Sequence, residues 1–370
     1  MKSFVQKLLF FSNNNQHFSR NSPTTYIKKI VAMNILLSGI SCLNAMEVSK
    51  ETSISRNSFP DAIITLQDQA STIISITSST DRKNFLTGFS DKTACLYDLK
   101  GVFISCFKGH TGFIRSVAYS PNSETVLTGS LDGTARLWTL EGYLLVIFEG
   151  HTGGITSVAF SPNGETILTG SLDGTARLWD LHGYPLATLQ GHTGSIWAVA
   201  FSPNGKTVLT GSYDNTARLW DLESNPKGML LTTFVGHAKG ILSVAFSPTG
   251  KTVATGSNDH TARIWSLTGE SLAVFHGHAG SIWAIAYSPN GKMILTGSDD
   301  KTAYLWNLTD TILATFQGHT DSVLAVTFSP DGDTAFTGSP DGTIRRWNIE
   351  KIKDSMCEQT INNLNIFLSL

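Results

Sequence analysis

Short apolar runs separated by turn sequences recur along most of the chain. In one segment the runs are Ile196–Phe201, Thr207–Gly211 and Thr216–Trp220, and the turns are Ser202-Pro203-Asn204-Gly205 and Tyr213-Asp214-Asn215. Proline at the second turn position and glycine at the fourth favour a β-turn, because proline presets its own φ angle. The pattern has no helical period and predicts short strands joined by tight turns.

This pattern belongs to a unit that occurs six times in full. Each copy begins with Gly-His and has a tryptophan about 28 residues later, and the copies follow at 41 residues except for one step of 45. A further apolar run, such as Leu272–Phe275, precedes the next Gly-His and supplies a fourth strand. A fixed period of this length indicates one supersecondary unit that is copied along the chain. The tryptophans are Trp138, Trp179, Trp220, Trp265, Trp306 and Trp347.

Four-strand units at this period, with Gly-His and Trp-Asp marks, resemble the WD40 family of β-propellers. Trp179-Asp180 and Trp220-Asp221 carry the family dipeptide unchanged. The resemblance covers about residues 60–350. It implies an all-β fold, a seven-bladed WD40-type β-propeller with four antiparallel strands per blade. Residues 1–59 and 351–370 are then an N-terminal segment and a C-terminal tail outside the propeller.

The seventh unit is eroded and lies first in the chain. Leu86-Thr87-Gly88 and the segment 91–98 align with the other units, but Tyr97 stands in place of the tryptophan and Asp68-Gln69 in place of Gly-His. This blade is expected to be the least stable. The last unit has three strands of its own, so we expect 62–66 to pair beside 343–347 and close the ring, which removes exposed strand edges.

Each full unit repeats a histidine, a threonine, an aspartate and the tryptophan, as in His192, Thr210, Asp214 and Trp220. Such a set could be mistaken for a nucleophilic triad, but six copies in one chain favour a structural role. The resemblance implies a buried hydrogen-bonded chain inside each blade. The histidines are His110, His151, His192, His237, His278 and His319, and the aspartates are Asp132, Asp173, Asp214, Asp259, Asp300 and Asp341.

Positions that differ between the units are the candidates for binding. The resemblance places the start of each innermost strand, and the residue before each repeated aspartate, around one mouth of the ring. Tryptophan, tyrosine and arginine dominate binding hot spots, which predicts a partner-binding surface here. The alternative is that Trp197 and Trp283 pack between blades, because they share strand parity with Val199 and Ile285. The predicted binding residues are Phe113, Arg115, Leu131, Leu172, Trp197, Tyr213, Leu242, Trp283, Asp299 and Leu324.

Composition narrows the class of partner. The 370 residues carry a formal net charge of −2 and a pI near 6.5, so no basic excess favours nucleic acid or an anionic membrane. The sequence therefore predicts a monomeric, non-enzymatic scaffold that binds a protein or peptide, without cofactor or metal. A nucleic-acid or chromatin adaptor is the first alternative. A propeller enzyme is the second, and the expected small Ser, Ala and Thr residues of the channel disfavour it.

The cysteines and the N-terminal segment bear on the compartment. Cys95 and Cys106 are expected on neighbouring strands as isolated core thiols. Lys28-Lys29 followed by the mostly apolar stretch 30–45 resembles an export signal, and the stretch is too short and polar for a membrane span. Export is favoured, with an organellar presequence, a start at Met33 or a cytoplasmic chain as alternatives. Stable membrane insertion is not expected beyond an N-terminal signal or anchor.

Overall fold

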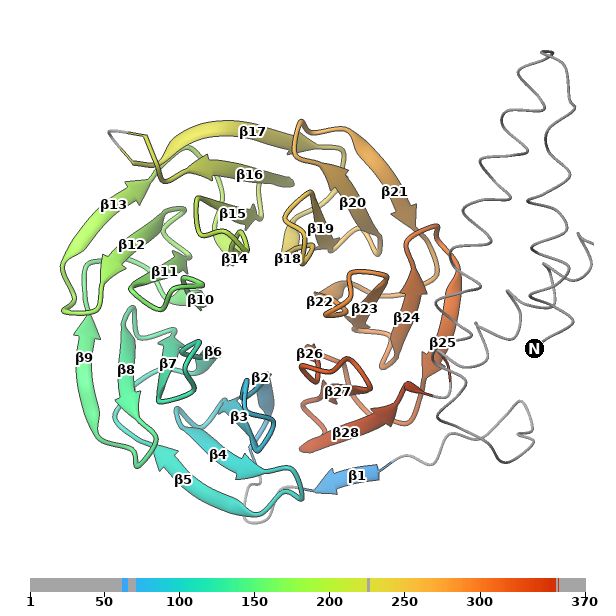
Figure 1. Cartoon of the computed structure of the whole chain (residues 1–370), viewed down its shortest axis with the longest axis horizontal. Coiled ribbons are helices and arrows are strands. Elements are labelled where there is room, and N and C mark those ends of the chain that lie inside the picture. Colours follow the sequence, from blue (N-terminus) through green and yellow to red (C-terminus); the bar gives the residue numbers. More distant parts are fainter. Residues whose placement is uncertain (1–61, 66–70, 225–226, 351, 353–370) are drawn as a thin grey trace, which may run out of the picture. The chain divides into compact units, whose positions relative to one another are not determined.

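Seven four-stranded antiparallel sheets stand around a common axis and form the blades of a propeller (Figure 1). The computed structural model describes residues 62–65, 71–224, 227–350 and 352. Residues 57–350 form one compact unit. The other unit, 1–56 with 351–370, lies outside the described residues apart from residue 352, as do the predictions made for those segments. No helix of the described part is long and apolar enough to cross a membrane.

Each blade runs from an inner strand at the axis to an outer strand at the rim. The inner strands of blades 1 to 7 are β2 (Ile73–Ser78), β6 (Ile114–Tyr119), β10 (Ile155–Phe160), β14 (Ile196–Phe201), β18 (Ile241–Phe246), β22 (Ile282–Tyr287) and β26 (Ala325–Phe328). The second strands are β3 (Asn84–Phe89), β7 (Thr125–Ser130), β11 (Thr166–Ser171), β15 (Thr207–Ser212), β19 (Thr252–Ser257), β23 (Met293–Ser298) and β27 (Thr334–Gly338).

The third strands carry the repeated tryptophans, and the fourth strands form the rim. The third strands are β4 (Ala94–Asp98), β8 (Ala135–Thr139), β12 (Ala176–Asp180), β16 (Thr216–Asp221), β20 (Ala262–Ser266), β24 (Ala303–Asn307) and β28 (Thr343–Asn348). The fourth strands are β5 (Phe103–Phe107), β9 (Leu144–Phe148), β13 (Pro185–Leu189), β17 (Met229–Val235), β21 (Ser271–Phe275), β25 (Ile312–Phe316) and, in blade 7, β1 (Ala62–Thr65).

Blade 7 combines strands from both ends of the described chain. β1 pairs antiparallel with β28, in a register that runs from Ala62 opposite Arg346 to Thr65 opposite Thr343. The sequence predicts a strand in this stretch, because the last unit supplies only three strands of its own. The pairing covers the edge of β28, which would otherwise offer unpaired backbone groups to another chain.

Glycines in the second strands let neighbouring blades approach each other. A methyl group at Gly170 would lie only 2.7 Å from Val199 Cγ1 and 2.8 Å from Ile196 Cγ2 of the next blade. Ser157 adds a polar link, because its Oγ accepts the Val199 N–H at 3.1 Å. The repeated Leu-Thr-Gly sequence is therefore a packing requirement between sheets.

Blade 1 is built without the histidine and tryptophan of the other blades. Tyr97 is fully buried and stacks on Phe85 with ring centroids 5.7 Å apart. Cys95 and Cys106 lie opposite each other on β4 and β5 and are joined by a disulfide. The expectation of isolated core thiols is therefore wrong. The two strands pair in the register that brings these side chains together.

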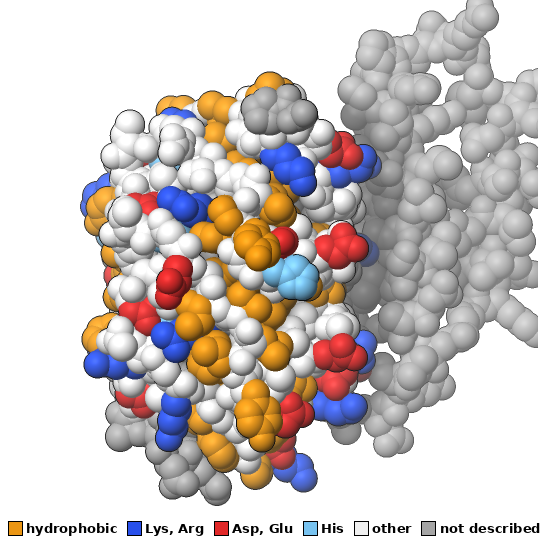
Figure 2. All heavy atoms as spheres, turned by 90° about the vertical axis from the view of Figure 1, so that its left-hand side faces the viewer, with side chains coloured by type: hydrophobic (Ala, Val, Ile, Leu, Met, Phe, Trp, Pro, Cys, Tyr) orange, Lys and Arg blue, Asp and Glu red, His pale blue; other side chains and the backbone are white. Residues whose placement is uncertain are grey.

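The outer strands leave apolar side chains on the rim, and Figure 2 shows them over the side formed by β9 and β13. Leu145 is 50% and Leu186 42% exposed. Comparable residues are exposed on the outer strands of other blades, including Phe103, Leu230, Leu272 and Ile312. This apolar rim surface recurs from blade to blade. The residues at the channel mouth, described below, differ between blades.

Candidate binding site at the channel mouth

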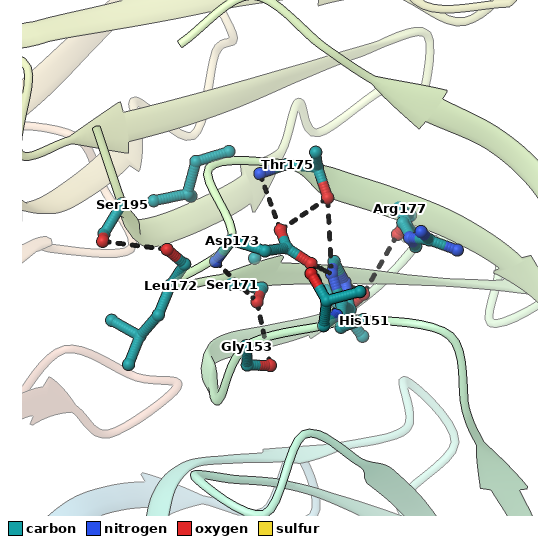
Figure 3. A network of polar contacts seen from close by, with 12 residues as sticks. His151, Gly153, Ser171, Leu172, Asp173, Thr175, Arg177 and Ser195 are labelled. Atoms are coloured by element: carbon teal, nitrogen blue, oxygen red, sulfur yellow. Dashed lines mark hydrogen bonds and ion pairs between the residues drawn. The ribbon is translucent and has the colours of Figure 1, made fainter. Parts of the chain in front are cut away.

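A hydrogen-bonded chain inside each full blade fixes the loops from which the site is built. In blade 3, His151 Nδ1 lies 2.8 Å from Asp173 Oδ2 and Nε2 lies 2.8 Å from Thr169 Oγ1. Trp179 donates its indole N–H to the same hydroxyl at 2.9 Å. Thr175 donates its hydroxyl to Asp173 (Figure 3). The chain joins β11, β12, the turn between them and the loop that carries Gly-His.

The direction of the bonds follows from the charge states. Burial would raise the pKa of Asp173, but hydrogen bonds from Thr175 and His151 lower it to about 2. Burial lowers the pKa of His151 against the opposing effect of Asp173. At neutral pH the carboxylate is ionised and the imidazole neutral, so Nδ1–H donates to Asp173 and Nε2 accepts from Thr169.

The same chain occurs in six blades. The distance from histidine Nδ1 to aspartate Oδ2 is 2.7–2.9 Å throughout. The distance from tryptophan Nε1 to threonine Oγ1 is 2.8–3.0 Å. The threonines are at most 1% exposed, so their hydroxyls cannot meet a substrate. The set acts as framework.

The framework aspartate also positions its neighbour at the mouth. Asp173 accepts the N–H of Thr152 at 3.0 Å, and Leu172 donates its N–H to Gly154 O at 2.9 Å. Ser195 of the next blade donates to Leu172 O at 3.0 Å (Figure 3). These bonds hold the Leu172 backbone on the side of the ring that carries the Gly-His loops. They do not involve its side chain, so the residue at this position can differ between blades.

A β-bulge at the start of the inner strands aims one residue per blade into the channel. In blade 4, Ile196 pairs with Ser212 and Ala198 with Gly211, which leaves Trp197 as the extra residue. An extra residue reverses the alternation of faces, so the alternative based on strand parity is wrong. The bulge residues of blades 1 to 6 are Ile74, Arg115, Thr156, Trp197, Leu242 and Trp283.

The sequence contains a signal for these bulges. Ile196 and Val199 both contact Gly170 of the preceding blade, although they are three residues apart. Two residues of one strand that face the same side are normally separated by an even number of steps. The recurring apolar pair at a spacing of three therefore indicates one inserted residue. A strict alternation of faces along the run does not predict this inserted residue.

The bulge residues line a cavity of about 200 Å³ in the central channel. Leu324, which precedes β26, completes the ring in blade 7. The rest of the lining consists of small residues and aliphatic side chains, among them Ser116, Ser157 and Ala198. All seven blades thus contribute to one cavity.

Three residues from alternate blades meet across this cavity. The Arg115 guanidinium carbon lies 5.1 Å from the ring centroid of Trp197 and 5.7 Å from that of Trp283. The two indoles pack edge to face at 5.8 Å. Trp283 donates its indole N–H to Asp299 Oδ1 at 2.5 Å, and Trp197 packs beside Tyr213 at 6.2 Å.

Burial separates the predicted binding residues into two groups. Trp197, Trp283, Arg115, Asp299 and Leu324 are half-buried around the cavity. Leu242 is only 4% exposed, so it lines the cavity but does not extend the surface that the sequence predicts. The most exposed members are Phe113 at 47%, Leu131 at 38%, Leu172 at 39% and Tyr213 at 53%.

The exposed members lie on blades 2 to 4 and make the mouth asymmetric. Leu131 packs against the next blade, where a methyl group at Gly154 would lie 2.9 Å from Leu131 Cδ2. The corresponding positions of blades 5 to 7 hold Asn258, Asp299 and Pro340. One half of the mouth is therefore apolar and the other half more polar. We call Phe113, Leu131, Leu172 and Tyr213 the apolar arc.

Comparison with known proteins identifies the family. Six segments match the family model described as WD domain, G-beta repeat, at residues 101–139, 142–180, 183–221, 228–266, 269–307 and 310–348. The chain belongs to this WD40 family. Strands β2 to β4 lie outside the matched segments, yet they form a blade of the same topology. No curated protein matches the chain.

Proposed function

We propose that this propeller is a non-enzymatic scaffold, monomeric by itself, that binds a peptide or a partner protein at the channel mouth. The observation that carries the proposal is the asymmetry of the mouth. The repeated framework is the same in six blades. The apolar arc and the cluster of Arg115, Trp197 and Trp283 each occur once. Exposed apolar surface beside half-buried tryptophan and arginine is typical of protein-binding hot spots.

The other function classes have less support. No aspartate, glutamate or histidine is among the residues that line the cavity, so the cavity offers no general acid or base. Within the described residues no cluster of three metal-ligating side chains occurs. A net charge of −2 provides little attraction for nucleic acid. A salt-sensitive mobility shift would favour a nucleic-acid adaptor instead.

The test is affinity purification of the full chain with mass spectrometry, repeated with variants. Phe113→Ala/Tyr213→Ala removes exposed side chains of the apolar arc, and Trp197→Ala/Trp283→Ala removes the aromatic pair beneath it. We expect both double variants to lose bound partners at least about tenfold, because hot-spot truncation costs 2 kcal/mol or more. Tyr143→Ala is the control, since Tyr143 is 71% exposed on the opposite side of blade 2, in the turn before β9.

Circular dichroism and the melting temperature establish that each variant is folded. Partners that bind both double variants as well as they bind the native chain would refute the mouth as the binding surface. Loss of partners with Tyr143→Ala alone would move the site to the opposite side of the propeller.

A further inference from the structure

Arg115 places a cation in the channel cavity without a counterion. No carboxylate of the described residues lies within ion-pair distance of its guanidinium, and its Nε is buried without a hydrogen-bond partner. Burial lowers the pKa of Arg115 below its ordinary value, but a guanidinium stays protonated in proteins. A half-buried charge without an ion-pair partner costs folding free energy.

The contacts with the two tryptophans leave the hydrogen-bond donors of this cation available. The guanidinium carbon lies over the rings of Trp197 and Trp283, at 5.1 Å and 5.7 Å from their centroids. A cation–π contact uses the charge of the guanidinium and does not require its N–H groups as hydrogen-bond donors. The aromatic pair therefore contacts the guanidinium without using its hydrogen-bond donors.

A set of hydroxyl groups lies in the same cavity with donors to spare. Ser75, Ser116, Ser157 and Ser243 line it. Each Oγ accepts a backbone N–H of a neighbouring blade, at 3.0–3.3 Å. A hydroxyl that accepts such a bond still has its own proton to donate. No hydrogen-bond acceptor for these four protons is present among the described residues.

The residues that line the cavity thus provide hydrogen-bond donors and no negative charge. Its lining includes one arginine and no acidic side chain, and the nearby Asp299 is bound to the Trp283 indole. Hydrogen-bond donors in a partly buried site act more strongly on a negative charge than they do in bulk water, because the local dielectric is lower. A volume of about 200 Å³ admits a small group and excludes a folded element.

We propose that the channel cavity binds an anionic oxygen group, a carboxylate or a phosphoryl group, that the peptide inserts at the mouth. The group pairs with Arg115 and accepts from the serine hydroxyls, while neighbouring apolar residues of the peptide cover the apolar arc. This inference rests on the proposed function, since it specifies the chemistry of the peptide that binds there.

The anion chemistry is tested first, by thermal unfolding of the full chain in sodium acetate, phosphate or sulfate against chloride at equal ionic strength. Binding to the native state raises the melting temperature. We expect a saturable rise that Arg115→Gln loses and Arg115→Lys retains in part. Arg136→Gln is the matched control, because Arg136 lies in the same blade but over Gly109, outside the cavity lining. The same rise in Arg115→Gln as in the native chain would overturn the proposal.

The peptide is tested next, by selection from a random peptide library on the full chain. Selected peptides should share an acidic side chain or a free C-terminal carboxylate near apolar residues. Changing that carboxylate to an amide should weaken peptide binding to the native chain about tenfold or more, as expected for the loss of a charge-assisted bond. The same change should have little effect on binding to Arg115→Gln. Phosphoserine at that position then distinguishes a phosphoryl preference from a carboxylate preference.

Two outcomes separate the inference from the proposed function. Peptides that compete at the mouth, have no acidic position and bind Arg115→Gln unchanged would overturn the inference and leave the proposed function intact. A library that yields no mouth-binding peptide would refute the proposed function and, with it, the peptide as the carrier of the anion.

Discussion

Blade 4 contains two tryptophans that serve different ends. Trp220 is 2% exposed and donates its indole N–H to Thr210 at 2.9 Å, and the same arrangement occurs in five other blades. Trp197 is half-buried on a β-bulge, and it meets Arg115 and Trp283 across the channel. The residues that repeat in every full blade stabilise the blade, and the residues that differ between blades form the channel mouth.

The largest effect that this comparison predicts is on stability. Trp220→Ala should lower the free energy of unfolding by about 3–5 kcal/mol, because it removes a fully buried aromatic side chain and leaves Thr210 and His192 with fewer partners. Urea unfolding followed by circular dichroism measures this. Trp197→Ala in the same blade is the control, and it should cost clearly less because its side chain is half-buried. Equal losses would mean that both tryptophans are framework.

Most of the framework could be predicted from the sequence. The period of Gly-His and tryptophan sets the number and length of the strands, and the turn at 202–205 has the expected bond, with the Gly205 N–H donating to Ser202 O at 2.9 Å. These features depend on local chemistry that each unit repeats. Even the eroded blade 1 forms four strands, since its Leu-Thr-Gly and the segment 91–98 keep the local pattern.

The mouth could be predicted only as a set of positions. The contact of Arg115 with Trp197 and Trp283 joins three blades, and no local pattern encodes a distance across the channel. The direction of Trp197 depends on a bulge, whose signal is the spacing of Ile196 and Val199. The Cys95–Cys106 disulfide likewise depends on the register of β4 against β5, which the repeat does not determine where its tryptophan is missing.

A smaller effect should follow from removing one hydroxyl of the framework. Thr210→Val keeps the shape of the side chain but deprives the Trp220 indole of its acceptor and His192 Nε2 of its donor. Buried groups left unpaired cost about 1–3 kcal/mol, so the loss should be below that of Trp220→Ala. A loss greater than that of Trp220→Ala, measured by the same urea unfolding, would contradict the ranking.

A change of pH distinguishes the framework from the mouth without a substitution, because it acts on the framework histidines. Burial lowers the pKa of His110, His151, His192 and His319 from the ordinary value of 6.5. The unfolded chain therefore binds more protons below pH 6.5, and stability must fall as the pH decreases from there towards the lowered folded values. The slope is about 1.4 kcal/mol per pH unit for each such histidine.

The aspartates add a second, more acidic loss. Asp132 and Asp173 have a pKa of about 2 in the folded chain against 3.8 ordinarily, so their contribution is present above about pH 4 and disappears as the pH falls towards 2. Urea unfolding between pH 8 and pH 3 should show both phases. His192→Gln should have a shallower first phase, because one histidine no longer titrates, whereas Trp197→Ala should retain the native slope. A free energy of unfolding that stays constant from pH 7 to pH 5 would contradict the neutral, buried imidazoles on which the framework rests.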